Sequence, residues 1–139
     1  MVMNTKIYKK VHTLAESLMK AVDREDQESF DNDYAQLQSI CEEHEGTEKD
    51  HPVQWETLAD FTGEFELAVT LYEKALLKAE AISSIDFCSS IGYALSTMKL
   101  ELEDKAGAIA SLEKAKAACL EIEDKELNAE IHDLLTELT

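Results

Sequence analysis

Apolar residues recur along this chain at intervals of three and four positions, and they seldom alternate with polar ones. The first series is Ile7, Val11, Leu14, Leu18 and Val22, with Tyr8, Ala15 and Met19 beside it. Residues at these intervals share one face of an α-helix, whereas a half-buried strand needs strict alternation. A broad apolar face indicates a helix that packs on more than one neighbour. The pattern therefore predicts an all-α fold.

Six further segments continue this periodicity, and short polar turns separate them. Gly46 suits the left-handed end of the second helix, and Pro52 suits the first turn of the third. We predict seven helices in one domain over residues 1–139, because a chain of this length can bury a core of its own. They form three antiparallel hairpins, at about residues 5–45, 52–82 and 86–122, and a C-terminal capping helix at about 125–138.

An internal repeat organises the second half of the chain. Ala68 and Ala75 enclose a segment that ends in Glu-Lys-Ala, and Ala108 and Ala115 enclose a similar one forty positions later. Self-similarity at such a period is typical of stacked helical repeats. Small residues seven positions apart lie on one helix face, where a neighbouring helix can approach closely.

Residues 49–82 and 89–122 resemble the tetratricopeptide repeat (TPR) family. The first copy matches it at the turn Gly63-Glu64 and at Phe65, Ala68, Tyr72 and Ala75. The second matches it at Leu95, Ser96, the turn Glu103-Asp104, Ala108, Leu112 and Ala115. The departures are Trp55 and Glu56 at the leucine and small positions, and Lys99 where an aromatic residue is usual. The resemblance implies hairpins that stack as a right-handed superhelix.

The resemblance also implies that the first helices of the hairpins line a concave groove, which receives a peptide or protein segment. The corresponding positions in this chain are Val53, Thr57, Asp60, Tyr93, Thr97 and Leu100. One TPR subclass grips a C-terminal carboxylate with Lys and Asn in such a groove, but no cation stands at these positions. An apolar floor with an acidic rim favours a basic or amphipathic ligand instead.

The net charge of −17 is unevenly distributed along the chain. Residues 1–22 carry four basic and one acidic side chain (+3), residues 23–66 carry two and fifteen (−13), and residues 67–139 carry seven and fourteen (−7). Such a charge repels nucleic acids and anionic membranes and attracts a basic protein. The acidic side chains that we expect to form a second candidate surface are Asp26, Glu28, Asp31 and Asp33.

The sequence indicates no catalytic, metal or cofactor site. Nucleotide-binding, nucleophile and zinc-protease motifs are missing, and carboxylates are too abundant for an acid–base pair to stand out. The pairs Glu48/His51 and Cys41/His44 have ligand spacing, but each lacks the further ligands of a complete site. Three cysteines without a CxxC motif suit a reducing compartment. No apolar run has the length of a signal peptide or a membrane span, so we expect a cytoplasmic location.

Three functions agree with these features, and none of them is enzymatic. The first is an adaptor that binds a basic or amphipathic protein segment through its groove or its acidic surface. The second is an acidic inhibitor, similar to a bacterial immunity protein or antitoxin, that masks a basic toxin or enzyme. The third is a structural protein that self-associates, for example as a homodimer, through the ends of the stack.

Overall fold

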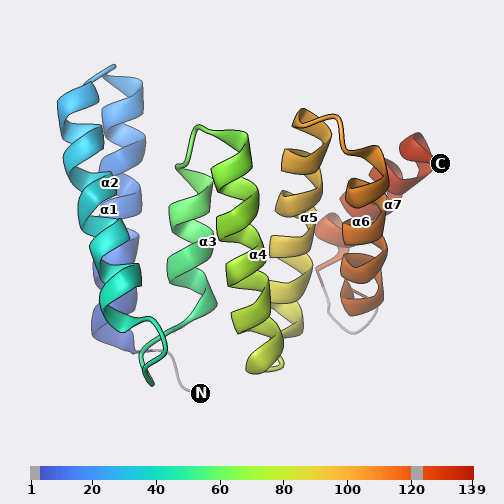
Figure 1. The fold of residues 1–139 in the computed structure, drawn as a ribbon, viewed down its shortest axis with the longest axis horizontal. Coiled ribbons are helices and arrows are strands. Elements are labelled where there is room, and N and C mark those ends of the chain that lie inside the picture. The colour runs from blue at the N-terminus through green and yellow to red at the C-terminus, as the bar shows by residue number, and fades with distance from the viewer. Residues whose placement is uncertain (1–3, 120–123) are drawn as a thin grey trace.

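The computed structural model describes residues 4–119 and 124–139, and every regular element within these ranges is an α-helix. The helices are α1 (Thr5–Asp23), α2 (Gln27–His44), α3 (Pro52–Asp60), α4 (Phe65–Ala81), α5 (Ile85–Glu101), α6 (Lys105–Cys119) and α7 (Lys125–Leu138). Three hairpins stand side by side, and α7 follows them (Figure 1). The predicted all-α architecture is confirmed, while the predicted end of the third hairpin at residue 122 lies outside the described residues.

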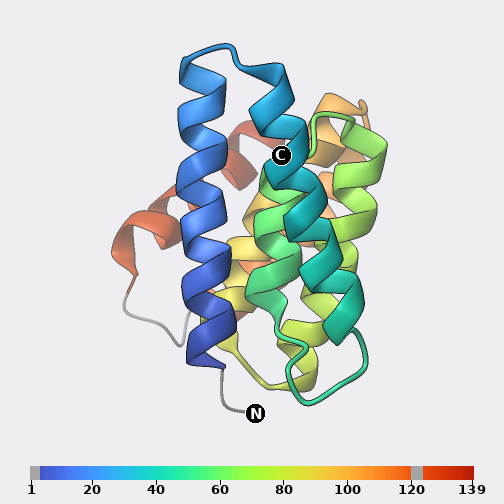
Figure 2. The ribbon, with the colours of Figure 1, turned by 90° about the vertical axis from the view of Figure 1, so that its left-hand side faces the viewer.

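The hairpins arrange their helices in two layers. The first helices contact one another in the order α1, α3 and α5, and α5 also contacts α7. The second helices, α2, α4 and α6, make no such contacts with one another within the described ranges. Figure 2 shows this separation, with α1 and α7 on one side of the molecule and α2 and α4 on the other. We call the layer of α1, α3 and α5 the inner layer, and that of α2, α4 and α6 the outer layer.

The repeated alanines lie at the centre of the packing. Ala68, Ala75, Ala108 and Ala115 are all fully buried, as their spacing predicted. The contact between α5 and α6 is closer still, because a Cβ atom placed on Gly92 would lie 2.9 Å from the Cβ of Ala115. The small residues therefore allow neighbouring helices to approach to a distance that larger side chains would prevent.

Helix α1 departs from its predicted packing on one side. Ala21 is buried in line with Val11, Leu14 and Leu18. Val22, which we predicted on that face, is 57% exposed, and the neighbouring Met19 is 61% exposed. A step of one residue rotates a side chain by about 100° around the helix, so a row at 11, 14, 18 and 21 turns position 22 away from the core. The prediction was wrong for Val22 and Met19, while the contacts of α1 with both α2 and α3 agree with a helix that packs on more than one neighbour.

Three turns, after α1, α4 and α5, have the same backbone conformation and hydrogen bonds. This conformation allows a chain with four glycines to form tight turns. In each turn a residue other than glycine adopts positive φ: Glu25 at 54°, Ser83 at 55° and Glu103 at 60°. The residue that follows donates its N–H to a carbonyl five positions back, and its side chain caps the next helix; these residues are Asp26, Ser84 and Asp104. This is the Schellman arrangement, in which glycine is the usual left-handed residue. After α2 the residue with positive φ is a glycine, Gly46 at 78°, but its N–H is donated to Asp50 Oδ2 instead of to a carbonyl of the helix.

Candidate functional site

The six predicted groove residues lie on two neighbouring helices of the inner layer. Val53, Thr57 and Asp60 follow one another at intervals of four and three on α3, and Tyr93, Thr97 and Leu100 do the same on α5. This spacing places each set on one helix face, and α3 contacts α5 directly. Five of the six are half-buried, and Asp60 is exposed. The two rows meet in one region, and their role in binding remains a prediction.

The two threonines of these rows use their hydroxyl hydrogens within their own helices. Thr57 Oγ1 donates to the carbonyl of Val53 at 2.6 Å, and Thr97 Oγ1 donates to the carbonyl of Ala94 at 2.7 Å. Each hydroxyl oxygen keeps an acceptor lone pair, and each side chain keeps a methyl group. These positions therefore suit a ligand that brings apolar groups and hydrogen-bond donors.

Two carboxylates connect α3 to the helices beside it. Glu56 Oε2 accepts a hydrogen bond from Ser90 Oγ of α5 at 3.0 Å, and Asp60 Oδ1 accepts one from the hydroxyl of Tyr72 of α4 at 2.5 Å. From the sequence, Glu56 was recognised only as a departure from the repeat, and Ser90 was missed. A carboxylate at a position where the repeat expects a small residue was the signal that would have identified this pair.

The environment of this pair changes its protonation. Burial raises the pKa of Glu56 to about 7, and the negative charge of Asp60 adds to that effect while the Ser90 hydrogen bond opposes it. Although Asp60 is exposed as a whole residue, burial of its carboxyl group raises its pKa too, against the hydrogen bond from Tyr72. Glu56 is therefore partly protonated near neutral pH, and a cation placed beside it would favour its charged form.

Tyr93 lies where the inner surface meets α7. It packs against a cluster of buried residues that includes Leu112 of α6 and Ile131 and Leu135 of α7. Burial raises the pKa of the Tyr93 hydroxyl, and the negative charge of Glu130 on α7 adds to the effect. Tyr93 thus helps to hold α7 in place, so that its replacement affects packing as well as any ligand.

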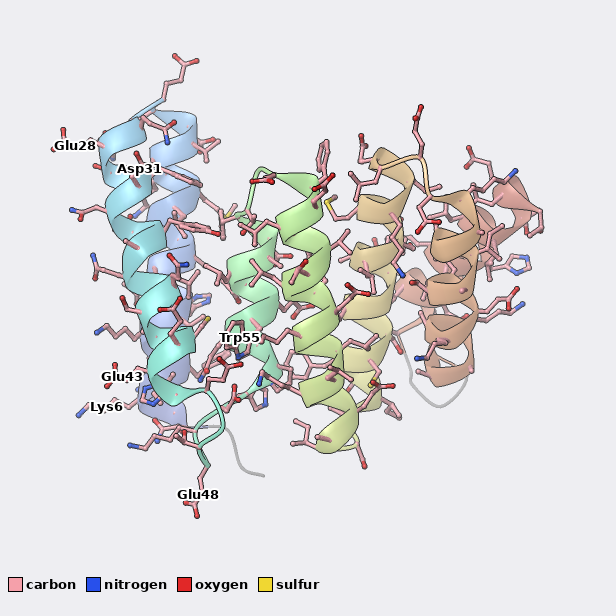
Figure 3. The ribbon with its side chains drawn as sticks, in the orientation of Figure 1. Lys6, Glu28, Asp31, Glu43, Glu48 and Trp55 are labelled. Atoms are coloured by element: carbon pink, nitrogen blue, oxygen red, sulfur yellow. The ribbon has the colours of Figure 1, made fainter. Side chains whose placement is uncertain are left out.

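The predicted acidic surface has two kinds of residue. Asp26 caps α2 by accepting from the N–H of Ser29 at 3.1 Å, and Asp33 accepts from the hydroxyl of Ser17 on α1. The hydrogen bonds from Ser29 lower the pKa of Asp26. Glu28 and Asp31 are exposed near the start of α2, at the outer edge of the molecule (Figure 3). Asp31 accepts a hydrogen bond from Gln27 Nε2 of the same helix at 2.7 Å, but neither Glu28 nor Asp31 caps α2 or joins it to α1 in the described chain.

A buried polar cluster behind the inner layer was not predicted from the sequence. Asp50, which is 8% exposed, accepts hydrogen bonds from Trp55 Nε1 at 2.8 Å, from Lys78 Nζ at 2.6 Å and from the N–H of Gly46 at 2.8 Å. Burial tends to raise the pKa of Asp50, but the hydrogen bonds from Lys78, Gly46 and Trp55 outweigh it, so the pKa is lowered. Trp55 is labelled in Figure 3. The cluster joins the loop before α3 to α4 and so fixes the position of α3.

The candidate metal ligands serve other purposes. His51 Nδ1 accepts the N–H of Val53 at 3.1 Å and caps α3, and Cys41 Sγ donates to the carbonyl of Gln54. Within residues 4–119 and 124–139 no group of three or more potential ligands is placed to hold a metal ion. The same residues include no helix that is long and apolar enough to cross a membrane.

The fold resembles that of solved structures with which it shares little sequence. The crystal structure of PcrH in complex with the chaperone binding region of PopD has a TM-score of 0.63 and 17% identity, over 99% of this chain and 96% of that chain. The crystal structure of PcrH from Pseudomonas aeruginosa has a TM-score of 0.55 and 17% identity, over 91% and 92%. No family model matches the chain. No curated protein matches it in sequence. The likeness shows a TPR-like helical fold.

Proposed function

We propose that this chain is a protein-binding adaptor that holds a segment of another protein along the inner surface formed by α3 and α5. The observation that carries the proposal is the pairing of two half-buried rows, Val53/Thr57/Asp60 and Tyr93/Thr97/Leu100, on adjacent helices. The solved complex of PcrH with a region of PopD supports a protein segment as the ligand of such a fold. The proposal assigns the chain a binding role in the cytoplasm, without catalysis.

The chemistry of the inner surface favours a basic or amphipathic segment. Apolar side chains of the segment would contact Val53 and Leu100, while a lysine or arginine would lie beside Glu56 and Asp60. Because the pKa of Glu56 is about 7, a cation beside it would displace its proton on binding. Affinity for a basic segment should therefore fall as the pH drops below about 7, and calorimetry in buffers of different ionisation enthalpy should record the released proton.

Substitution at Thr97 tests the inner surface directly. Affinity capture from a cell lysate, followed by proteolysis of the captured complex, would identify the protected segment, and isothermal titration would measure its affinity. Thr97→Lys introduces a cation in the middle of the surface, so we expect binding of a basic segment to weaken by about tenfold or more. Tyr93→Ala should also weaken binding, although part of its effect arises from the packing of α7.

A matched control is available on the outer layer. Thr70 of α4 is exposed and, like Thr97, donates its hydroxyl to a backbone carbonyl of its own helix. Thr70→Lys makes the same chemical change away from the inner surface and should leave the affinity unaltered. Equal affinities for the wild type, Thr97→Lys and Tyr93→Ala would remove the inner surface from the proposal.

Masking of a basic toxin or enzyme is a second candidate, favoured by the exposed carboxylates at the start of α2. Charge reversal at Glu28 and Asp31 is a cleaner test than reversal at Asp26 or Asp33. Asp26 caps α2 and Asp33 binds Ser17 of α1, whereas Asp31 accepts only an exposed hydrogen bond from Gln27 of its own helix. An inhibitor of this kind should associate more slowly after the reversal and at higher salt. An association rate that neither change affects would exclude it.

Self-association is the third candidate, and the solvent-exposed apolar side chains of α1 favour it. Tyr8, Met19 and Val22 are exposed there, and apolar side chains gathered on one face are typical of protein contacts. Sedimentation of the wild type and of a Met19→Asp variant would decide the matter, since a monomer in both cases contradicts this candidate.

A further inference from the structure

A groove lies on the outer surface of the molecule, between α4 and α6, with α5 as its floor. Its volume is about 450 Å³. Leu76 and Leu77 line one wall, and Gly92 and Leu95 line the floor. Leu77 is 68% exposed, more than the other large apolar side chains on the described surface. An apolar groove with an exposed leucine at its edge is typical of an interaction site.

The groove is open because the helices around it are unevenly spaced. The close approach of Gly92 to Ala115 draws α6 onto α5, and the α6 residues that face the groove are mostly alanine. In Figure 1, α5 separates α4 from α6, and those two helices make no direct contact in the described chain. Because the α6 side chains at this position are mostly alanine, they do not fill the space between α4 and α6, and another molecule can enter it.

The shape of the groove suits a helix. The residues of α4 that line it recur at intervals of three and four and are Glu73, Leu76, Leu77 and Glu80. Those of α5 follow the same intervals and are Cys88, Gly92, Leu95 and Lys99. At a rise of about 1.5 Å per residue, the groove thus runs for about 10 Å along α4 and about 16 Å along α5. Such ridges are the surface into which the side chains of a further helix interdigitate.

The charges around the groove differ from those of the rest of the chain. Lys99 Nζ donates to Ser111 Oγ at 2.9 Å, and within the described residues it forms no ion pair with a carboxylate. Lys114 on the α6 wall lies 3.8 Å from Glu80 on the α4 wall, and both side chains are exposed. In a chain of net charge −17, this groove is therefore balanced in charge, because Glu73 and Glu80 line it together with the two lysines. Lys99 is the half-buried member of this set and has no carboxylate partner among the described residues, so it is free to accept one.

We propose that this outer groove binds an amphipathic helix of a partner protein, whose apolar residues pack on Leu76 and Leu77 and whose carboxylates pair with Lys99 and Lys114. The partner differs in charge from the one proposed for the inner surface, where Glu56 and Asp60 favour a cation. The chain would then hold an acidic helix on one face and a basic segment on the other. This inference does not depend on the inner-surface proposal, because no residue belongs to both sites.

A displayed library of helical peptides tests the groove even though its natural partner is unidentified. The peptides carry leucine at intervals of three and four, are about 18 residues long because shorter helices are marginal in water, and are randomised between Glu, Lys, Gln and Ser at the flanking positions. The selection uses the full chain with the Thr97→Lys substitution, which should weaken binding of basic peptides at the inner surface. We expect enrichment of peptides with glutamate beside the leucine stripe.

The enriched peptides are then measured against variants of the groove. Leu77→Asp and Lys114→Glu should each weaken binding by about tenfold or more, and Lys99→Glu should do so as well if the variant folds. Replacing the matching glutamate of the peptide by lysine should restore binding to Lys114→Glu. Leu67→Asp on α4 and Lys116→Glu on α6 make the same changes outside the groove and should have no effect.

The selection distinguishes this groove from the inner surface. Enrichment that depends on Leu77 and Lys114 supports the groove, whatever Thr97→Lys does to the binding of basic segments. A selection that enriches no peptide, or one whose peptides bind Leu77→Asp and Lys114→Glu as well as the parent, would overturn the inference. Self-association of the free chain that Leu77→Asp abolishes would also overturn it, because the groove would then belong to a second copy.

Discussion

The hairpins α3–α4 and α5–α6 share a sequence repeat, yet different interactions hold their helices together. In the first, the short helix α3 is fixed by a polar cluster in which Asp50 accepts hydrogen bonds from Trp55 and Lys78. In the second, Gly92 and Ala115 bring the helix backbones into close contact, and one hydrogen bond, from Lys99 to Ser111, also joins α5 to α6. The repeated alanines are buried in the packing of both hairpins. The residues that depart from the repeat account for the interactions that differ between the two hairpins.

The departures also separate the two candidate binding surfaces. Glu56 occupies a position where the repeat expects a small residue, and it places a carboxyl group with a raised pKa on the inner surface. Lys99 occupies a position where an aromatic is usual, and it places an ammonium group in the outer groove. The inner surface therefore carries carboxyl groups, whereas the outer groove combines two lysines with the glutamates Glu73 and Glu80.

Removal of Asp50 should have the largest effect on stability. Asp50→Ala leaves the half-buried Lys78 with only the more distant carboxylate of Glu45, at 3.9 Å, and leaves the indole N–H of Trp55 without an acceptor. Loss of one partner of a buried ion pair costs about 3–5 kcal/mol, so we expect a decrease of that size in the free energy of unfolding. Chemical denaturation at pH 7 measures it. Glu48→Ala, in the same loop but exposed, should change stability by less than about 0.5 kcal/mol, and an equal loss in both variants would contradict the importance of the cluster.

The second prediction concerns the stability of the close contact between α5 and α6. In Gly92→Ala the new methyl group meets the Cβ of Ala115, which has no rotamer that would move it away. Overpacking costs about 1–3 kcal/mol, whereas alanine in a helix gains about 0.5–1 kcal/mol over glycine, so a net loss of about 1–2 kcal/mol is expected. Gly63→Ala has open space around its Cβ and should be neutral or stabilising. A Gly92→Ala protein as stable as Gly63→Ala would show that the helices separate easily.

The sequence predicted most of the helices and the packing of the alanines, because both follow from periodicity within a single element. It also predicted Gly46 and Pro52 at the ends of helices, because those residues have strong local preferences. The Asp50–Lys78 pair was missed because its partners are 28 positions apart and neither has a local signature. The exposure of Val22 was predicted wrongly, since the apolar pattern is ambiguous by one residue at the end of a helix.

Glu56, on the inner surface, should make the free energy of unfolding depend on pH. The pKa of Glu56 rises from 4.5 to about 7 on folding, so its stabilising contribution is complete below pH 4.5 and is lost as the pH rises through 7. Glu56→Gln keeps an acceptor for Ser90 and removes the titration. We expect the variant to match the wild type near pH 4.5 and to exceed it by about 1–2 kcal/mol at pH 8, after allowance for partial exposure.

Denaturant unfolding at both pH values measures the difference between Glu56→Gln and the wild type. Glu73→Gln makes the same chemical change at an exposed position of the outer layer and serves as the control. A constant difference between Glu56→Gln and the wild type over this range would mean that Glu56 titrates normally, and the proton release proposed for ligand binding would then fail with it.

The smallest expected effect concerns the turn between α5 and α6. Glu103 has φ 60°, a conformation that costs a residue with a side chain about 1–2 kcal/mol, partly offset in Glu103→Gly by the greater flexibility of glycine in the unfolded chain. We expect Glu103→Gly to stabilise the protein by about 0.5–1 kcal/mol in thermal or chemical unfolding. Glu101→Gly, two positions earlier and within α5, should destabilise it by about 1 kcal/mol, because glycine is a poor helix former. Since Glu25 and Ser83 adopt the same conformation, their glycine variants should behave as Glu103→Gly does. If Glu103→Gly and Glu101→Gly lost the same stability, the left-handed conformation assigned to Glu103 would be contradicted.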